Sequence, residues 1–285
     1  MDRLECAGSI SYFSDPRANW IADNTEGVTR KEVHIVARHA YFTRRCSLIN
    51  QEPRTRPRMS HSVRGHLRLE IDEYDATIRR WIPGYEQMLR VASEAVASVH
   101  PARVVDLGAG TGALSEALLE REEVGSVVAL DVDPEMLQRA TERVKRFGER
   151  ARSILRSFHE PFEPGDAFAA SLSLHHIPTL DAKAALFRRV FVSLPAGGVL
   201  VNADCCMPED PGERQALFEY WAEHQMAHGI PEERAWAHFE EWSGEDTYLP
   251  LQTELTALRD IGFEADRIWN DGPIGVVVAR KPSEK

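Results

Sequence analysis

Residues 104–120 read VVDLGAGTGALSEALLE and place three glycines between an apolar run and a helical pattern. A strand that passes through such a loop into a helix brings bare backbone amides close to whatever lies above the sheet edge. The glycines follow a G-x-G-x-G spacing, whereas dinucleotide-binding loops prefer G-x-G-x-x-G. The loop therefore predicts a ligand that approaches the backbone closely and does not favour a dinucleotide.

Two acidic residues narrow the chemistry of that ligand. Asp106 stands two residues before Gly108, where a carboxylate repels a pyrophosphate and attracts an ammonium group. Asp131 ends the next apolar run, at the spacing where a carboxylate accepts hydrogen bonds from ribose hydroxyls. An amino-acid head group and a free ribose diol together describe S-adenosylmethionine. The alternative is a tight strand-to-helix turn that binds nothing.

From residue 102 onward, short β-branched runs alternate with helical ones, which is typical of βαβ units and a parallel sheet. We predict a Rossmann-like α/β fold, with a mostly parallel seven-stranded sheet and helices on both faces. Asp133 and Asp181 are placed to cap two of the helices. The predicted strands are 103–107, 126–131, 151–155, 167–174, 198–204 and a final pair around Asp271 and Gly272; the predicted helices are 113–121, 134–147, 182–194 and one ending near Gly262.

The remaining segments suggest how the chain is organised. Residues 207–248 are rich in Glu, His and Trp, and we predict a helical lid inserted there after the fifth strand; residues 70–100 form a helical cap element. Residues 59–285 are thus the predicted compact domain. Residues 1–58 lack periodicity, so they are either a disordered tail or an extension upstream of a true start at Met59.

Charge and composition limit the partners. The formal net charge is −11, although residues 1–58 hold ten Lys and Arg against seven Asp and Glu, so the rest of the chain is still more acidic. Such a surface repels a phosphate backbone, which makes nucleic acid an unlikely partner.

The chain lacks an apolar run of about 18 residues and a signal peptide, so we expect a cytoplasmic protein without a membrane contact. The four cysteines show no CxxC spacing, which predicts reduced thiols and no metal site; a homodimer is compatible with the sequence.

Three motifs occur in an order that resembles the class I S-adenosylmethionine-dependent methyltransferases. VVDLGAGTG is similar to motif I, ALDVDPEMLQRA to the second motif, and LPAGGVLV to the loop before the fifth strand. The resemblance covers residues 103–280 and implies an enzyme that transfers a methyl group from S-adenosylmethionine to a small-molecule acceptor by in-line displacement. Because pocket shape decides the acceptor, the motifs do not name the methylated atom.

The resemblance also implies which residues hold the cofactor. Asp131 would bind the ribose, Val132 would pack on the adenine, and Tyr85 in the IPGYEQML segment would reach the cofactor carboxylate. Many relatives place an acid after the third strand to meet the adenine amino group. This chain has RSFHEPF there, so Ser157 and the backbone of Phe158 would have to serve. The methionine part would be lined by Gly108, Ala109 and Gly110.

The chemistry of transfer is expected at the carboxyl ends of the fourth and fifth strands. His175 occupies the place of a general base in related O-methyltransferases that read His-Asp-Trp, and its alternative is a packing role. Asp204 ends the fifth strand and either orients the acceptor, holds a histidine tautomer or caps the following segment. The aromatic residues of the insertion form either a lid over the pocket or a small core of their own: Trp221, Trp236, Trp242 and Tyr248.

Two other functions remain open at this stage. The PGY element is shared with the tRNA wobble-uridine carboxymethyl-donor family, whose members need a basic residue for an extra cofactor carboxylate. Arg79 and Arg80 lie near that element. The second alternative is a non-catalytic cofactor-binding protein that has lost its acceptor site.

Overall fold

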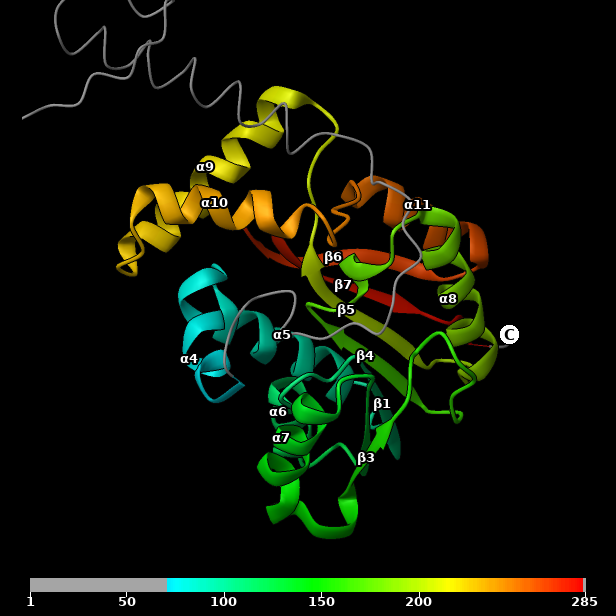
Figure 1. Cartoon of the computed structure of the whole chain (residues 1–285). Coiled ribbons are helices and arrows are strands. Elements are labelled where there is room, and N and C mark those ends of the chain that lie inside the picture. The colour runs from blue at the N-terminus through cyan, green and yellow to red at the C-terminus, as the bar shows by residue number, and fades with distance from the viewer. Residues whose placement is uncertain (1–70, 284–285) are drawn as a thin grey trace, which may run out of the picture. The chain divides into compact units, whose positions relative to one another are not determined.

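The computed structural model describes residues 71–283, which contain a seven-stranded sheet (Figure 1). The strand order is β3-β2-β1-β4-β5-β7-β6; β1 to β5 pair in parallel, and β7 is antiparallel to both of its neighbours. The predicted fold class is confirmed. The strands are β1 (Arg103–Leu107), β2 (Ser126–Asp131), β3 (Ala151–Leu155), β4 (Ala167–Ser171), β5 (Val199–Cys205), β6 (Glu264–Asp271) and β7 (Ile274–Arg280).

The strand order reverses direction between β1 and β4, which lie side by side although two strands separate them in sequence. The chain leaves β1 toward β2 on one side, and it leaves β4 toward β5 on the other. Loops that follow two such strands diverge and open a crevice at the carboxyl edge of the sheet. The glycine loop after β1 and the histidine loop after β4 therefore border the same crevice.

Helices cover both faces of the sheet (Figure 1). On the face of α5, the buried residues Met88, Ala92 and Val96 recur every four residues, which places them in one stripe against the strands. On the opposite face, Phe168 of β4 and Phe187 of α8 belong to the main hydrophobic core. One face carries α5 (Tyr85–Ala97), α6 (Ala113–Leu119) and α7 (Pro134–Val144), and the other carries α8 (Leu180–Ser193) and α11 (Leu251–Ile261).

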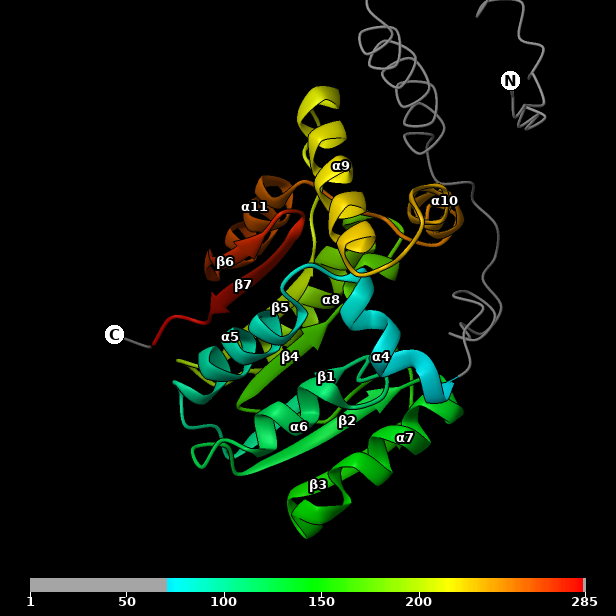
Figure 2. The same cartoon turned by 90° about the vertical axis from the view of Figure 1, so that its left-hand side faces the viewer.

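The segment between β5 and α11 folds into α9 (Pro211–Ala227) and α10 (Glu232–Trp242). The helix α4 (Ile71–Trp81) lies against α9 (Figure 2). Trp221 Nε1 donates a hydrogen bond to the Trp81 carbonyl oxygen at 2.5 Å, and the Trp81 ring also contacts Trp242. The insertion therefore shares its aromatic core with a helix that precedes the sheet.

Several element boundaries differ from the prediction. The fourth strand ends at Ser171 instead of 174, because Leu172 takes a left-handed φ of 50° that a strand residue cannot adopt. A short 3-10 turn, η2 (Leu174–His176), follows. The helix predicted over 134–147 already ends at Val144, where the 3-10 turn η1 (Lys145–Arg150) begins.

One of the two predicted helix caps is also wrong. Asp133 caps α7 as predicted, since its carboxylate accepts from the amides of Glu135 and Met136. The cap of α8 is Thr179, which accepts from the Ala182 amide, and Asp181 lies in the first turn. The carboxylate there still favours the positive end of the helix dipole.

Residues 1–58, predicted to be a tail or an extension, lie outside the described residues. Between residues 71 and 283, none of the helices combines the length and the apolarity needed to cross a membrane.

Candidate active site

A cavity of about 500 Å³ opens at the carboxyl edge of the sheet, next to β1 and β4. Its walls come from the glycine loop, the loop after β4, α4, α5 and the insertion. The volume falls in the range of about 300–1,000 Å³ that small-molecule sites occupy. Among the described residues that line it, none is Lys or Arg, while three are aspartates: Asp106, Asp131 and Asp246.

The three glycines of the loop all have positive φ angles, between 56° and 81°. A side chain on Gly108 would place its Cβ 2.6 Å from Ser173 Cβ, and one on Gly112 would meet Ala140 of α7 at 2.9 Å. At Gly110 the nearest such atom is Met136 Cε, 3.8 Å away. Packing within the chain therefore explains Gly108 and Gly112, and Gly110 alone leaves open space for an approaching ligand.

Asp106 is fully buried on the cavity wall. Its Oδ2 accepts a hydrogen bond from Ser115 Oγ at 2.6 Å, and within the described structure its Oδ1 has no hydrogen-bond partner. Burial raises the pKa of this carboxyl to about 7. An oxygen left without a donor at a cavity wall suits an ammonium group, which would supply the missing hydrogen bond and favour the ionised carboxylate.

Asp131 lies at the end of β2 with both carboxylate oxygens oriented by backbone amides. Its Oδ2 accepts from Gly110 N at 2.7 Å, and its Oδ1 accepts from Asp133 N at 2.8 Å. Each oxygen retains a lone pair, because a carboxylate can accept about four hydrogen bonds. The carboxylate therefore ties the glycine loop to β2 and can still accept from a diol.

His175 lies on the η2 turn, and the carboxylate of Asp204 contacts its ring. Its Nδ1 lies 2.5 Å from Asp204 Oδ1, and its backbone N–H donates to Asp204 Oδ2 at 2.9 Å. Asp204 is buried within β5 and does not line the cavity, so its carboxylate contacts the histidine and not the ligand space. Burial lowers the pKa of His175, but the negative charges of Asp204 and Asp246 outweigh it and raise the pKa above its usual value.

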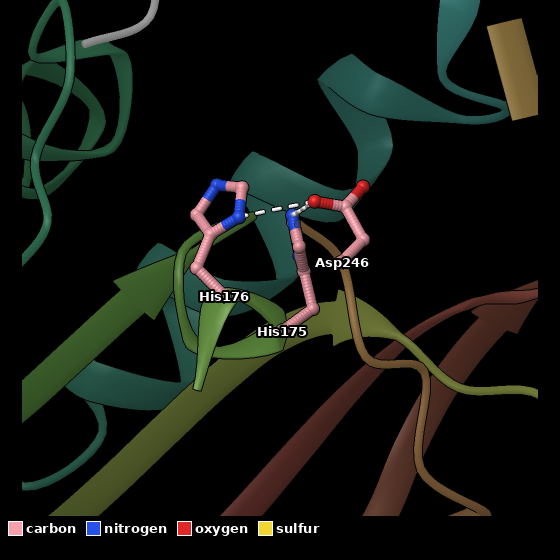
Figure 3. A group of neighbouring side chains, drawn as sticks. All are labelled: His175, His176 and Asp246. Atoms are coloured by element: carbon pink, nitrogen blue, oxygen red, sulfur yellow. Dashed lines mark ion pairs between the residues drawn. The ribbon is translucent and has the colours of Figure 1, made fainter. Parts of the chain in front are cut away.

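Asp246, which belongs to the insertion, places its carboxylate beside the rings of His175 and His176 (Figure 3). Its Oδ1 lies 3.1 Å from His176 Nδ1 and 3.7 Å from His175 Nε2, and Tyr248 Oη donates to its Oδ2 at 2.7 Å. The Thr247 amide donates to the His175 carbonyl oxygen at 2.8 Å. The loop after α10 and the loop after β4 are thus joined by both side-chain and backbone contacts.

The known proteins that this chain resembles include methyltransferases and a related synthase. Residues 104–198 match the family model described as "Methyltransferase domain". The carboxy-S-adenosyl-L-methionine synthase of Chromohalobacter salexigens is 29% identical over 160 residues, covering 53% of this chain and 58% of that protein. The trans-aconitate 2-methyltransferase of Rhizobium etli is 32% identical over 150 residues, covering 51% of this chain and 54% of that protein. The chain spans roughly half, or less, of the length of such curated relatives.

The fold agrees with these matches. The solved structure of an O-methyltransferase family protein from Burkholderia thailandensis superposes with a TM-score of 0.63 at 14% identity, covering 89% of this chain and 72% of that one. Residues 104–198 therefore match a methyltransferase domain, and the described residues share the fold of an O-methyltransferase family protein.

In this methyltransferase fold, all residues predicted from sequence to contact the cofactor line one cavity, although their individual roles remain predictions. His175 lines the cavity and Asp204 does not. Trp236, predicted with the lid aromatics, also lies away from it and packs on Phe239. The cavity-lining residues predicted for the cofactor are Tyr85, Asp106, Gly108, Ala109, Gly110, Asp131, Val132, Ser157 and Phe158.

Sequence reasoning missed Asp246 and assigned no role to His176. Asp246 stands 70 residues after His176, in a stretch without regular structure, and no spacing links the two. The local signal was an acidic residue two positions before Tyr248, in a segment already predicted to be a lid. Ser115, the partner of the Asp106 side chain, was also missed; it lies on α6, nine residues after Asp106.

Proposed function

We propose that this protein transfers a methyl group from S-adenosylmethionine to a small-molecule acceptor. The observation that carries the proposal is the unpartnered Oδ1 of Asp106, which shares one cavity with Asp131 and with the open side of Gly110. An ammonium group at Asp106 and a ribose diol at Asp131 are the two polar ends of one ligand of this class. The bound cofactor supplies an electrophilic methyl group.

The chain's own task in such a transfer is alignment, because an in-line displacement needs the acceptor atom, the methyl carbon and the sulfur in one line. Apolar aromatic walls at the other end of the cavity, from Trp221, Trp242 and Tyr248, would hold the acceptor and exclude water. Asp204 acts here as a positioning residue, since it contacts the ring of His175 and lies outside the cavity.

A carboxy-S-adenosylmethionine chemistry is the second candidate, because relatives bear the name of that synthase. That cofactor carries an additional carboxylate, and a cation would be needed to hold it. The Arg79 guanidinium lies outside the cavity over the Tyr85 ring and pairs with Glu86, and Arg80 donates to the His228 carbonyl oxygen. The described cavity walls offer neither an arginine nor a lysine, which favours ordinary methyl transfer.

The test begins with the ligand. Mass spectrometry of the purified full chain should identify co-purified S-adenosylmethionine or S-adenosylhomocysteine, and calorimetry should show binding of one equivalent. A screen of acceptors for S-adenosylhomocysteine release then identifies the substrate class. Absence of binding to both compounds would refute the proposal; tight binding without release for any acceptor would favour the non-catalytic alternative.

A further inference from the structure

Three potential metal-binding atoms meet in the acceptor half of the cavity: His175 Nε2, His176 Nδ1 and Asp246 Oδ1 (Figure 3). All three lie within 4.8 Å of one another. The carboxylate oxygen is 3.1 Å from the His176 nitrogen and 3.7 Å from the His175 nitrogen. They come from two different loops, one after β4 and one after α10.

Neighbouring polar groups orient two of these three side chains. Asp204 holds His175 by Nδ1, and Tyr248 holds Asp246 by Oδ2. When His175 Nδ1 donates its proton to Asp204, the Nε2 of the neutral ring presents a lone pair to the Asp246 carboxylate. Two electron-rich atoms face each other stably only if a cation lies between them, and that cation is either an extra proton or a metal ion.

We propose that His175, His176 and Asp246 bind a divalent transition-metal ion such as Zn²⁺. Ligand atoms about 2.0–2.2 Å from a zinc ion lie roughly 3–3.5 Å from one another in a tetrahedral site. The 3.1 Å separation already fits, and the 3.7 Å separation needs a small side-chain movement. The two histidine nitrogens lie within 4.8 Å of each other and must also approach to about 3.5 Å when the ion binds. Two imidazoles with one carboxylate suit zinc or iron, whereas Mg²⁺ and Ca²⁺ prefer oxygen ligands throughout.

The surroundings match those of functional metal sites. A histidine ligand usually donates its other ring N–H to a carboxylate, and Asp204 occupies that place behind His175. Three protein ligands leave a fourth position open to the cavity, where an oxygen of a substrate or water can bind and have its pKa lowered. The ion would also tie the insertion to the loop after β4, since Asp246 belongs to the insertion.

The part of this inference that concerns the acceptor rests on the proposed function, but metal binding itself does not. A metal ion would occupy the Nε2 lone pair that a general base needs. The metal-ligand role and the predicted base role of His175 therefore exclude each other, and the experiment below decides between them.

The test uses the full chain after dialysis against a chelator, titrated with Zn²⁺ in a calorimeter. We expect one tight equivalent, weakened at least tenfold in Asp246→Asn and in His176→Ala. Asp204→Asn should weaken it by about 10–100-fold, as loss of a carboxylate behind a metal-bound histidine does. The matched control is His228→Ala, which removes a histidine pair at the C-terminal end of α9, where the rings of His224 and His228 lie 4.2 Å apart and could bind Zn²⁺. This variant must keep the tight equivalent.

Binding of S-adenosylhomocysteine to each variant serves as the folding control and separates the two proposals. If Asp246→Asn and His176→Ala bind S-adenosylhomocysteine normally but retain the wild-type Zn²⁺ affinity, the metal site is refuted. The same holds if the wild-type chain has no tight equivalent, in which case the cation is a proton and the proposed function stands. Zn²⁺ binding that depends on Asp246 in a chain without affinity for S-adenosylhomocysteine would instead retain the metal site and refute the proposed function.

Discussion

Asp106 carries a buried carboxyl group whose ionisation should be linked to ligand binding. Burial raises the pKa of this carboxyl from 3.8 to about 7. The free energy of unfolding of the unliganded protein should therefore fall as the pH rises from about 4 to about 7, because the unfolded chain releases the proton first. A ligand ammonium favours the ionised form, so the affinity for S-adenosylhomocysteine should rise by about tenfold between pH 6 and pH 8. Calorimetry over this range measures the slope. Asp106→Asn should bind more weakly and lose the part of the slope that the carboxyl contributes; an unchanged slope would show that another group titrates.

Asp131 should contribute to binding through hydrogen bonds to a charged acceptor. Asp131→Ala removes contacts of about 1.5–3 kcal/mol, so the dissociation constant for S-adenosylhomocysteine should increase about tenfold or more. The control is Asp266→Ala, an aspartate of β6 whose side chain is 83% exposed. Equal affinity of Asp131→Ala and the control would remove the ribose assignment.

At the scale of elements, the glycine loop can be tested with a matched pair of substitutions. Gly110 and Gly148 have φ angles of 56° and 59°, and a Cβ on Gly148 would meet no atom within 4 Å. Gly110→Ala and Gly148→Ala should each lower the free energy of unfolding by at least about 1 kcal/mol, because both place a side chain at positive φ. The loss should be larger for Gly148, whose ψ of −130° lies outside the left-handed helical region. Only Gly110→Ala should also lose cofactor affinity. If both variants bind equally well, the ligand does not lie over this loop.

A buried ion pair joins α8 to α11. Lys183 and Glu254 are both almost completely inaccessible to solvent and contact each other. Glu254→Gln leaves the lysine without a counter-charge and should lower the free energy of unfolding by about 3–5 kcal/mol. Glu241→Gln, which breaks an exposed pair with Arg234, should cost less than about 1 kcal/mol. Urea denaturation compares the two; similar losses would mean that water reaches the Lys183 site.

At the scale of the whole described structure, the insertion and the sheet should unfold together. The Trp221 indole donates to the Trp81 backbone of α4, and the Thr247 amide donates to the His175 backbone after β4. The aromatic core of the insertion therefore cannot open without breaking contacts to α4 and to the loop after β4. Tryptophan fluorescence and far-ultraviolet circular dichroism should report the same urea midpoint. An earlier fluorescence transition would show that the insertion opens by itself.

Much of the architecture could be read from residues close together in the chain. Alternating β-branched and helical runs predict the sheet, and a glycine after α11 predicts its end, because hydrogen-bonding period and backbone sterics act over a few residues. Asp106, Asp131 and His175 each follow or end a parallel strand, so topology alone brings them to one edge. The position of a residue along a strand is local information, and the sequence contains it.

The contact partners of side chains could not be predicted from the sequence, because they depend on segments that meet only after folding. That Gly108 accommodates Ser173 while Gly110 faces the cavity follows from how the loop after β4 packs on the loop after β1. That Asp204 lies behind His175 follows from the register of β5 beside β4. Asp246 reaches the two histidines because the aromatic core of the insertion packs on α4, which sets where the loop after α10 returns to the sheet. Periodicity carries no information about these long-range contacts, so the composition of the acceptor site emerges only from tertiary packing.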